Sequence, residues 1–526
     1  MTRLPSGASA LQLVAQATTL ELPNVEYSRF LPIMILIGGA LGILVLASLI
    51  GGRVAEGWWT GLSVATAGAA LVAGCWLWND VQRHGPGTAV SDALRVDGFS
   101  VWFTLVICSA VLLFSLMADG YVQRERLGGP EIHVLALLSA SGGLLMAYAN
   151  DLLVLFLGLE ILSIALYVMA GFHRRRDESG EAAMKYFVLG AFSSAIFLYG
   201  VALMYGATGS TRLDQINGLL TSLRAAEGDR NLALAGMALM IVGLGFKVAA
   251  VPFHTWTPDV YQGSPSPVTG FMAAAAKAAG FAGLIRVLTF GLQPLRDDWR
   301  PAIWALAVLT LVVGSVLAIV QTDVKRMLAY SSINHAGYVL VGLYANNVDG
   351  VAGAQYYLLT YAFTVLGSFA VVSVVARRGD STTSIEDYRG LYFRKPLLAV
   401  AFTILLAAQA GIPLTTGFLA KFAVIRAATT GDDYSLGIIA MLVTAVAAFF
   451  YLRLIVTVYA APEGVDAEHP DSAGSIAVLT QERTGLKVMP ATAAVIAVSV
   501  AMTVGAGLWA GPLLDFAKRA TIFFPS

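Results

Sequence analysis

The chain has 526 residues, of which 57% are hydrophobic and only 13% are charged, and its 33 basic residues balance its 33 acidic residues. Soluble proteins carry about 25% charged residues, so this composition indicates a protein of the lipid bilayer, and the zero net charge gives no case for a nucleic-acid partner. The two isolated cysteines, Cys75 and Cys108, exclude an iron–sulfur cluster or a structural zinc site built by this chain alone. We expect no cofactor in this chain.

Apolar runs long enough to cross a membrane occur about fourteen times, which predicts an all-α, polytopic fold. A spanning helix needs about 20 mostly apolar residues. The N-terminus lacks the features of a cleaved signal, so we expect the first run to persist as the first helix. The candidate spans are 30–50, 58–78, 99–117, 131–149, 152–172, 184–206, 232–262, 266–290, 302–320, 324–345, 354–377, 396–428, 436–460 and 488–511.

Two of these spans, 232–262 and 396–428, are longer than a bilayer requires. The first contains Lys247 and Pro252, and the second contains Pro413. Proline interrupts the hydrogen-bond ladder of a helix, and broken backbone at membrane depth is tolerated only where protein or water surrounds it. We therefore expect two discontinuous helices, which are typical of transport sites.

Short matches separated by about 170–174 residues indicate an internal repeat. Each copy would hold five helices, and an odd number places the second copy upside down in the membrane. The predicted divisions are N-terminal helices (1–130), a first repeat (131–290), a second, inverted repeat (302–460), and a loop with the last helix (461–526). The matching pairs are Asn150-Asp151 with Thr322-Asp323, residues 185–189 with 355–359, and Lys247 with Lys421.

Lysine and arginine in the loops predict the orientation. The dense basic clusters at 174–176 and 377–395 fall on the same side of the predicted topology. Because cytoplasmic loops are enriched in these residues, we expect both termini outside.

Four ionisable side chains lie inside apolar spans, where a charge costs about 2.5–3.5 kcal/mol on insertion scales and is usually functional. Glu160 lies near the middle of its span, and we expect Lys247 to be its partner. Burial disfavours a charged amine, so Lys247, Lys277 and Lys421 are predicted proton carriers. The alternatives are a protonated structural carboxyl for Glu160 and lysines that extend to the membrane interface.

Two histidines could relay protons. His254 follows the break at Pro252, where a structural role is equally compatible. His335 lies roughly where Glu160 falls in the first repeat. We predict a line of polar groups across the middle of the membrane, joined by water, that runs through Glu160, Lys247, Lys277, His335 and Lys421.

Charged residues in the loops have simpler interpretations. The cluster at 173–178 is expected to be a solvated loop, with an anionic lipid or a partner subunit as the alternative contact. The same interpretation applies to Lys325 and Arg326. Asp259 is expected to cap or form a turn.

Three runs resemble the subunit N family of bacterial respiratory complex I: AAMKYFVLGAFSSA at 182–195, FKVAAVPFHTWTPDVYQG at 246–263 and DVKRMLAYSSI at 323–333. The second run is shared with the wider antiporter-like family, whereas the first points to subunit N. The likeness covers about residues 95–460. In that family the intramembrane glutamate falls on Glu160, and the lysines fall on Lys247, Lys277 and Lys421.

The resemblance implies a proton-translocating membrane subunit of an NADH-quinone oxidoreductase in the bacterial plasma membrane. It implies that neighbouring antiporter-like and small membrane subunits are partners, and that flavin, iron–sulfur clusters and quinone are bound by partner subunits. The redox chemistry would then take place outside this chain.

Other classes of membrane protein stay open. One is a cation/proton antiporter subunit of the Mrp type, and another is the membrane subunit of a related hydrogenase or of a dehydrogenase with another electron donor. A third is a membrane scaffold whose lysines are assembly contacts.

Overall fold

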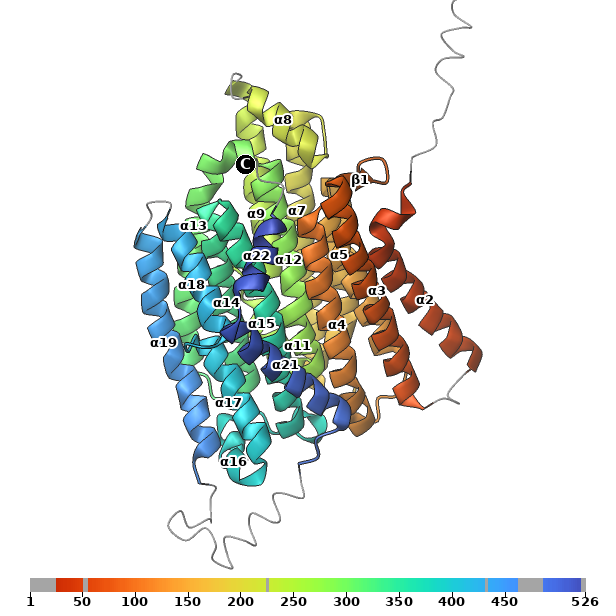
Figure 1. Cartoon of the computed structure of the whole chain (residues 1–526), viewed down its shortest axis with the longest axis vertical. Coiled ribbons are helices and arrows are strands. Elements are labelled where there is room, and N and C mark those ends of the chain that lie inside the picture. The colour runs from red at the N-terminus through yellow and green to blue at the C-terminus, as the bar shows by residue number, and fades with distance from the viewer. Residues whose placement is uncertain (1–24, 51–54, 224–226, 431–433, 462–485, 522–526) are drawn as a thin grey trace, which may run out of the picture.

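A computed structural model describes residues 25–50, 55–223, 227–430, 434–461 and 486–521. Its long helices run side by side through one bundle, and two short strands, β1 (Gly87–Ala89) and β2 (Leu94–Val96), form a hairpin at one end (Figure 1). Twelve helices among the described residues are long and apolar enough to cross a membrane. The predicted all-α, polytopic fold is confirmed.

Each predicted span contains a helix. The uninterrupted ones are α2 (Leu31–Ile50), α3 (Glu56–His84), α4 (Gly98–Glu125), α5 (Glu131–Tyr148), α6 (Leu152–Ala170), α7 (Asp177–Thr208), α13 (Arg296–Ile319), α14 (Val324–Ala345), α15 (Val348–Val375), α19 (Tyr434–Tyr459) and α21 (Pro490–Leu508). One further span is the succession α11 (Ser266–Phe271), η2 (Met272–Ala276), α12 (Lys277–Ile285) and η3 (Arg286–Gly291), in which η2 and η3 are π-helical.

The two long spans are broken, as predicted. In the first, α9 (Glu227–Val248) ends before α10 (Trp256–Gly263) begins. In the second, α17 (Pro396–Ala410) ends before α18 (Thr416–Thr429) begins. The chain leaves α9 through Ala249 and leaves α17 through Gly411, which have φ angles of 61° and 91°. This left-handed backbone stops the helical hydrogen-bond ladder and exposes carbonyl groups in the interior of the bundle.

Two equivalent clamps appear at opposite ends of the bundle. Asp151 caps α6 and accepts a hydrogen bond from the Thr211 hydroxyl at 2.6 Å, just before α8 (Leu213–Leu223). Asp323 caps α14 and accepts one from Thr383, just before η6 (Ile385–Tyr388) and α16 (Leu391–Arg394). Figure 1 places α8 and α16 at opposite ends of the molecule. The clamps support an inverted repeat, whereas the proposed divisions at 130, 290, 302 and 460 stay a prediction.

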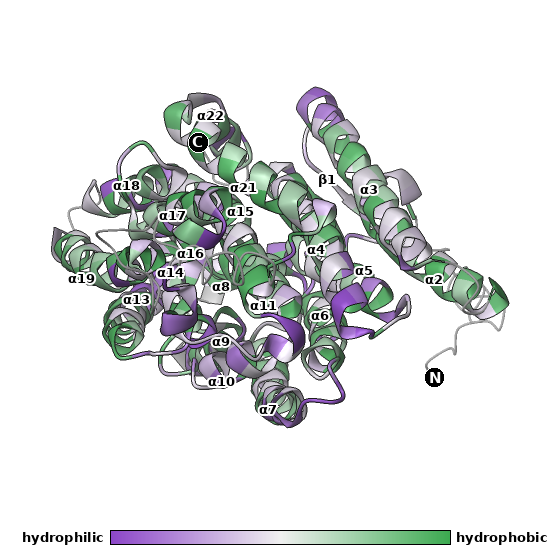
Figure 2. Ribbon diagram, turned by 90° about the horizontal axis from the view of Figure 1, so that it is seen from below, coloured by the Kyte–Doolittle hydropathy of each residue, from purple (hydrophilic) through white to green (hydrophobic). Residues whose placement is uncertain are grey.

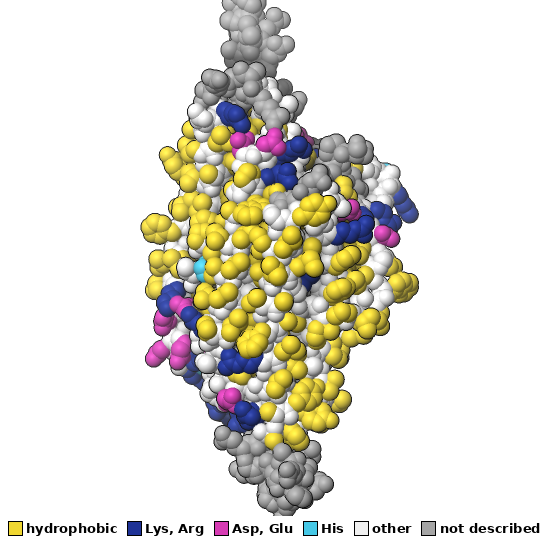
Figure 3. All heavy atoms as spheres, turned by 90° about the vertical axis from the view of Figure 1, so that its left-hand side faces the viewer, with side chains coloured by type: hydrophobic (Ala, Val, Ile, Leu, Met, Phe, Trp, Pro, Cys, Tyr) yellow, Lys and Arg dark blue, Asp and Glu magenta, His cyan; other side chains and the backbone are white. Residues whose placement is uncertain are grey.

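The centre of the bundle is formed by the helix of α11 to η3 together with α14 and α15. In the apolar 18-residue stretch of Ser266–Gly291 every residue is buried, whereas only 39% of the residues in the corresponding stretch of α7 are buried. Figure 2 shows α11 near the middle of the molecule, with α2 and α19 at opposite edges. Hydrophobic side chains cover much of the outer face in Figure 3. The polar residues of the central helices are therefore shielded from lipid by a ring of peripheral helices.

A buried ionic network joins the loops at the α16 end of the bundle. The Asp380 carboxylate accepts from Lys325 at 3.2 Å and from Arg176 at 3.3 Å, and it also accepts from the Ser266 amide at the start of α11. Lys325 donates to the Ser264 carbonyl at 2.5 Å. The network therefore fixes the junction between α10 and the central helix to both repeats.

The interpretation of these loops as solvated needs correction. Arg174 and Arg175 are exposed as expected, but His173 is buried beside Glu125 at 3.4 Å, and Lys325 is buried with its partner Asp380. These pairs connect segments far apart in the chain, so local sequence did not indicate them.

Replacing Asp380 with asparagine is expected to lower the stability of the folded chain by about 3–5 kcal/mol, because buried cations would lose their counter-charge. Burial alone would raise the pKa of Asp380, but Lys325, Arg124 and Arg176 hold the pKa below its usual value. The stabilisation should therefore be present above about pH 4 and fall as the pH drops through the lowered pKa. Thermal unfolding of purified protein at several pH values measures this.

The matched control is Glu386→Gln, which removes a surface partner of Arg389 and should change stability by only about 0–1 kcal/mol. Equal unfolding midpoints for the two variants would contradict a stabilising role for Asp380.

Candidate functional site

Lys247 lies in the last turn of α9, directly before the break, and its side chain is buried. Its ammonium group donates to the Ser163 hydroxyl of α6 at 2.8 Å and to the Tyr186 hydroxyl of α7 at 3.3 Å. It also lies 5.5 Å from the centre of the Tyr186 ring. The amine is thus held by neutral groups that can both accept and donate hydrogen bonds.

Glu160 does not contact Lys247 directly. Within the described part of the chain, no ion pair of 4.0 Å or less joins the two side chains, although Glu160 lies one turn before Ser163, which does contact Lys247. The hydroxyl of Ser163, three residues after Glu160 on α6, accepts a hydrogen bond from Lys247, the partner that the sequence predicts for the Glu160 carboxylate. Glu160 is half-buried, and its Oε1 atom has no hydrogen-bond partner among the residues that the structure describes. Glu160 and Lys247, which the sequence predicts to be partners, therefore lie on helices that the Ser163 hydrogen bond links, without a direct contact between their charged groups.

Lys277 begins α12, immediately after the π-helical segment η2. Its ammonium group donates to the Ser332 carbonyl of α14 at 2.5 Å and also to the Ser332 hydroxyl. The Tyr361 ring of α15 lies 6.0 Å from it. Single wide turns of this kind are frequent at functional sites, because they re-aim a side chain inside an otherwise regular helix.

His335 lies on α14, one turn after Ser332, and both ring nitrogens are engaged. Nδ1 is 2.6 Å from the Tyr357 hydroxyl, and Nε2 is 3.0 Å from the Tyr451 hydroxyl. The Tyr451 hydroxyl is also hydrogen-bonded to Ser331. Since imidazole and hydroxyl groups can each donate and accept, this cluster can pass a proton between α14, α15 and α19.

Lys421 lies on α18, the second half of the broken span, and donates to the Ala410 carbonyl at 2.9 Å. Ala410 is the last residue of α17, so the amine meets the negative end of a half-helix. The Tyr338 ring lies 4.8 Å from the ammonium group, and its hydroxyl is 2.6 Å from Thr444. This arrangement satisfies an amine inside the bundle without a carboxylate.

Aromatic side chains connect the second half of the site. The rings of Tyr361 and His335 are 4.6 Å apart, and those of Tyr338 and Tyr357 are 6.0 Å apart and stacked. With the contacts above, a continuous series of polar aromatic groups runs from Lys277 through His335 to Lys421.

Between Lys247 and Lys277 the series is less regular. Tyr186 stacks on Trp256 of α10 at 4.5 Å, and Trp256 contacts Tyr261 at 6.2 Å. Gly280 of α12 faces the Lys247 side chain, where an added Cβ atom would lie 3.2 Å from its Cγ. The two lysines therefore lie on neighbouring helices, α9 and α12, which are in contact.

His254 is placed differently from the other predicted residues. It lies in the turn that follows α9 and is half-buried, and its Nδ1 atom has no hydrogen-bond partner within the described ranges. No side-chain contact joins it to the lysines in the described part of the structure. Its proposed relay role has no geometric support beyond its position at the break.

The inverted clamps refine the position of His335 in the repeat. Asp151 and Asp323 are 172 residues apart, and the same offset places Ser163 opposite His335, not Glu160. Glu160 instead corresponds to Ser332, the residue that binds Lys277. The expectation that His335 lies roughly where Glu160 falls in the first repeat stays a prediction, and this offset places the two one helical turn apart.

A polar cavity of about 660 Å³ opens beside α10 at the α16 end of the bundle, lined by charged side chains that include Lys185, Asp259 and Asp380. Asp259 accepts from Lys185 at 2.8 Å and from Arg326 at 2.6 Å. It therefore joins both repeats, whereas the sequence suggested only a cap or turn. Tyr186 follows the lining residue Lys185 on α7, and its hydroxyl accepts a hydrogen bond from Lys247.

The sequence analysis missed the hydroxyl groups that complete the site, namely those of Ser163, Tyr186, Tyr338, Tyr357 and Tyr451. Hydroxyl-bearing residues are common in membrane helices and cost little there, so their presence gave a weak signal. No group of three or more His, Cys, Asp or Glu side chains that could hold a metal ion occurs among the described residues.

Comparisons with known proteins agree on one family. A family model described as "NADH:quinone oxidoreductase/Mrp antiporter, TM" matches residues 149–449. NADH-quinone oxidoreductase subunit N of Mycobacterium tuberculosis (strain ATCC 25618 / H37Rv) is 41% identical over 550 residues, covering 95% of this chain and 99% of the relative. The subunit N of Parafrankia sp. (strain EAN1pec) is 41% identical over 548 residues and covers 98% of both chains.

Solved structures show the same fold. A chain of respiratory complex I from Thermus thermophilus with bound Aureothin is 34% identical, with a TM-score of 0.74 over 92% of this chain and 98% of that one. A chain of the Mrp complex from Dietzia sp. DQ12-45-1b has a TM-score of 0.79 over 94% of this chain and 96% of that one, but is only 21% identical. The second similarity therefore concerns the fold alone.

The packing of the second broken span predicts a steric effect. A Cβ atom at Gly417 of α18 would lie 1.8 Å from the Ala408 carbonyl oxygen of α17. Gly417→Ala should therefore push the half-helices apart and destabilise the protein by about 1–3 kcal/mol. The control is Gly38→Ala, because nothing lies within 4 Å of a Cβ atom there. Thermal unfolding measures both, and an unchanged midpoint for Gly417→Ala would contradict this packing.

Proposed function

This chain belongs to the subunit N family of NADH-quinone oxidoreductases, and from that membership we propose that it translocates protons across a bacterial plasma membrane as one subunit of such a complex. One observation carries the proposal: three amines, on Lys247, Lys277 and Lys421, are each at most 5% exposed inside the bundle, yet none forms an ion pair with a carboxylate of the described residues. A permanently charged amine would be costly there, so these are groups suited to gaining and losing a proton.

The proton path follows the hydrogen-bonded groups of the site. Lys247 exchanges protons with Ser163 and Tyr186, and Lys277 with Ser332. The His335 cluster then connects Lys277 to the side of Lys421. Water fills the gaps, which include the region around Trp256 and the Oε1 atom of Glu160, for which the described part of the chain offers no hydrogen-bond partner.

Entry from the cytoplasm is assigned to the cavity beside α10. With the basic loops inside, this cavity opens to the cytoplasm and both termini lie outside. Lys185 and Asp259 line the cavity, and Tyr186, the residue after Lys185, accepts a hydrogen bond from Lys247. The Tyr186 ring stacks on Trp256, so a change in that stack would alter the link between the cavity and the first amine.

The energy for transport comes from partner subunits. Moving one charge against 100 mV requires about 2.3 kcal/mol. We assign NADH oxidation, flavin, iron–sulfur clusters and quinone to other subunits, so the chain acts enzymatically only as part of the proton-translocating oxidoreductase. The exposed apolar residues Leu157 and Ile161 flank Glu160 on α6, which makes this face suitable for a neighbouring membrane subunit.

An Mrp-type cation/proton antiporter subunit is the second candidate, because the matching family model describes both groups. Purification of the assembly that contains this chain distinguishes the two hypotheses. A large assembly with flavin and iron–sulfur absorbance supports the oxidoreductase, and a small assembly without them supports the antiporter. A related complex with another electron donor would lack NADH oxidation but retain iron–sulfur absorbance.

Lys247→Met is expected to leave the complex assembled but to reduce proton translocation about tenfold or more, since losing a positioned proton-transfer group typically costs ~10²–10⁴-fold. Proton uptake by vesicles that contain the complex, measured per NADH oxidised, tests this. Lys518→Met is the control, because that lysine pairs with Asp349 on the surface. Loss of assembly in Lys247→Met alone would instead indicate a scaffold.

Glu160→Gln keeps the shape of the side chain but removes its charge from the neighbourhood of Lys247. We expect the same vesicle assay to show strongly reduced proton translocation in a normally assembled complex. Unchanged translocation would remove Glu160 from the mechanism while leaving the three lysines in place.

A further inference from the structure

A second cavity, far more apolar than the first, lies between the start of α17 and the first half of α21. It has a volume of about 680 Å³, within the range of about 300–1,000 Å³ typical of ligand sites. Ten of its eleven lining residues are apolar, and the eleventh is Lys395. We name it the α17–α21 groove.

The groove exists because α21 presents small side chains towards it. Ala493, Ala497 and Ala501 follow one another at intervals of one helical turn, and all three line the groove. Leu397 of α17, at the opposite wall, is 87% exposed. Larger residues on α21 would fill this space, so the open slot is a consequence of its sequence.

The charge of the groove is confined to one end. Lys395 directly precedes α17, is half-exposed, and has no ion-pair or hydrogen-bond partner for its amine among the described side chains. Lys487, next to the lining residue Val488, is also exposed. The first residues of α17 add the positive end of a helix dipole on the same side.

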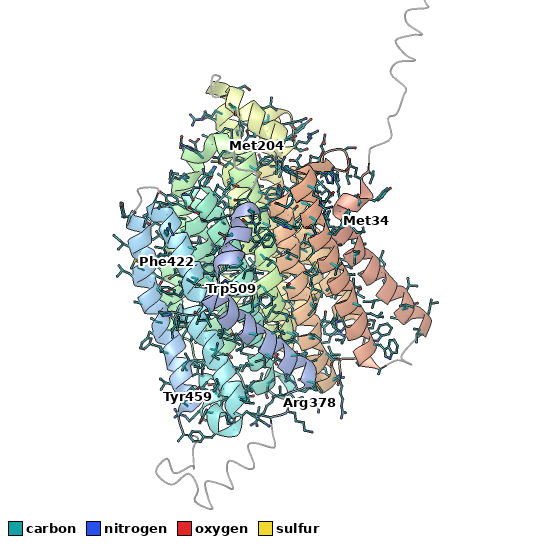
Figure 4. All side chains as sticks on the ribbon, in the orientation of Figure 1. Met34, Met204, Arg378, Phe422, Tyr459 and Trp509 are labelled. Atoms are coloured by element: carbon teal, nitrogen blue, oxygen red, sulfur yellow. The ribbon has the colours of Figure 1, made fainter. Side chains whose placement is uncertain are left out.

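This end of the groove lies at the boundary between membrane and water. Tyr392 and Tyr459 are both exposed and their rings are 5.1 Å apart, in the manner of the aromatic belts found at membrane interfaces. Figure 4 labels Tyr459 and the exposed loop residue Arg378 at this end of the bundle. The apolar part of the groove therefore extends from the interface towards the middle of the bilayer.

We propose that the α17–α21 groove binds an anionic phospholipid, with the phosphate at Lys395 and one acyl chain along the alanines of α21. The ligand class follows from the distribution of charge: a single positive end and an entirely apolar remainder match a molecule with one anionic head and a long hydrocarbon tail. Basic pockets between membrane helices on the cytoplasmic side bind lipid headgroups in this way.

The test uses the whole complex in nanodiscs of phosphatidylcholine that contain a trace of phosphatidylglycerol with a photoreactive acyl chain. A parallel sample contains phosphatidylcholine with the same reactive chain. Mass spectrometry quantifies labelled peptides from residues 396–401 and 493–501. We expect the anionic lipid to label these peptides several-fold more than the neutral lipid. Equal labelling by the two lipids in the unmodified complex would overturn the proposal, and that comparison needs no variant.

Variants separate the headgroup from the chain. Lys395→Gln should reduce labelling by the anionic lipid to the level of the neutral lipid, and Ala497→Leu should reduce labelling by both. The matched controls are Arg378→Gln and Ala494→Leu, which change exposed residues on the same side or the same helix outside the groove. Unchanged labelling in Lys395→Gln and Ala497→Leu would overturn the proposal.

A photoreactive residue at position 397 identifies the occupant directly. Attachment of a phospholipid supports the proposal. Attachment to residues 462–485 or to another subunit would show that protein covers the groove and would overturn it.

Discussion

An amine inside a membrane protein must be satisfied by neighbouring dipoles, and this requirement determines the architecture around the site. Lys421 meets the last carbonyl of α17, and Lys277 meets a carbonyl and a hydroxyl of Ser332. The carbonyl that Lys421 meets is free because α17 stops inside the bundle. Ser332 lies within the uninterrupted helix α14, and Lys247 is held by hydroxyl groups of α6 and α7, so the break supplies a partner for one lysine and residues of neighbouring helices supply those of the other two.

The two repeats supply hydrogen-bond acceptors for their buried lysines in different ways. In the first, Lys247 lies at the end of its own half-helix and turns to hydroxyl groups on α6 and α7. In the second, Lys421 lies beyond the break and reaches back to it. The ionic network around Asp380 joins the two repeats, so a movement of α10 is coupled mechanically to the start of α14 through Lys325. This connection gives the fold a route by which one half can affect the other.

The sequence predicted the spans and breaks well, because apolar length and proline are local signals. It also identified Lys247, Lys277 and Lys421, since charge within an apolar run is conspicuous. It failed in the choice of partners: Ser163 rather than Glu160, on the same helix α6, contacts Lys247, and Lys325 is buried with Asp380, 55 residues away in the chain. Tyrosines such as Tyr357 and Tyr451 looked like ordinary apolar side chains, and only the crossing of α15 and α19 near α14 revealed their shared contact with His335.

The opposed directions of α9 and α17 have an electrical consequence. Both half-helices end in the interior, but they enter from opposite ends of the bundle (Figure 1). Their macrodipoles therefore oppose each other, and the torques and forces that a transmembrane voltage exerts on them largely cancel. A transmembrane voltage therefore exerts little net effect on this pair of half-helices, and under the proposed function it would act mainly on the transported protons.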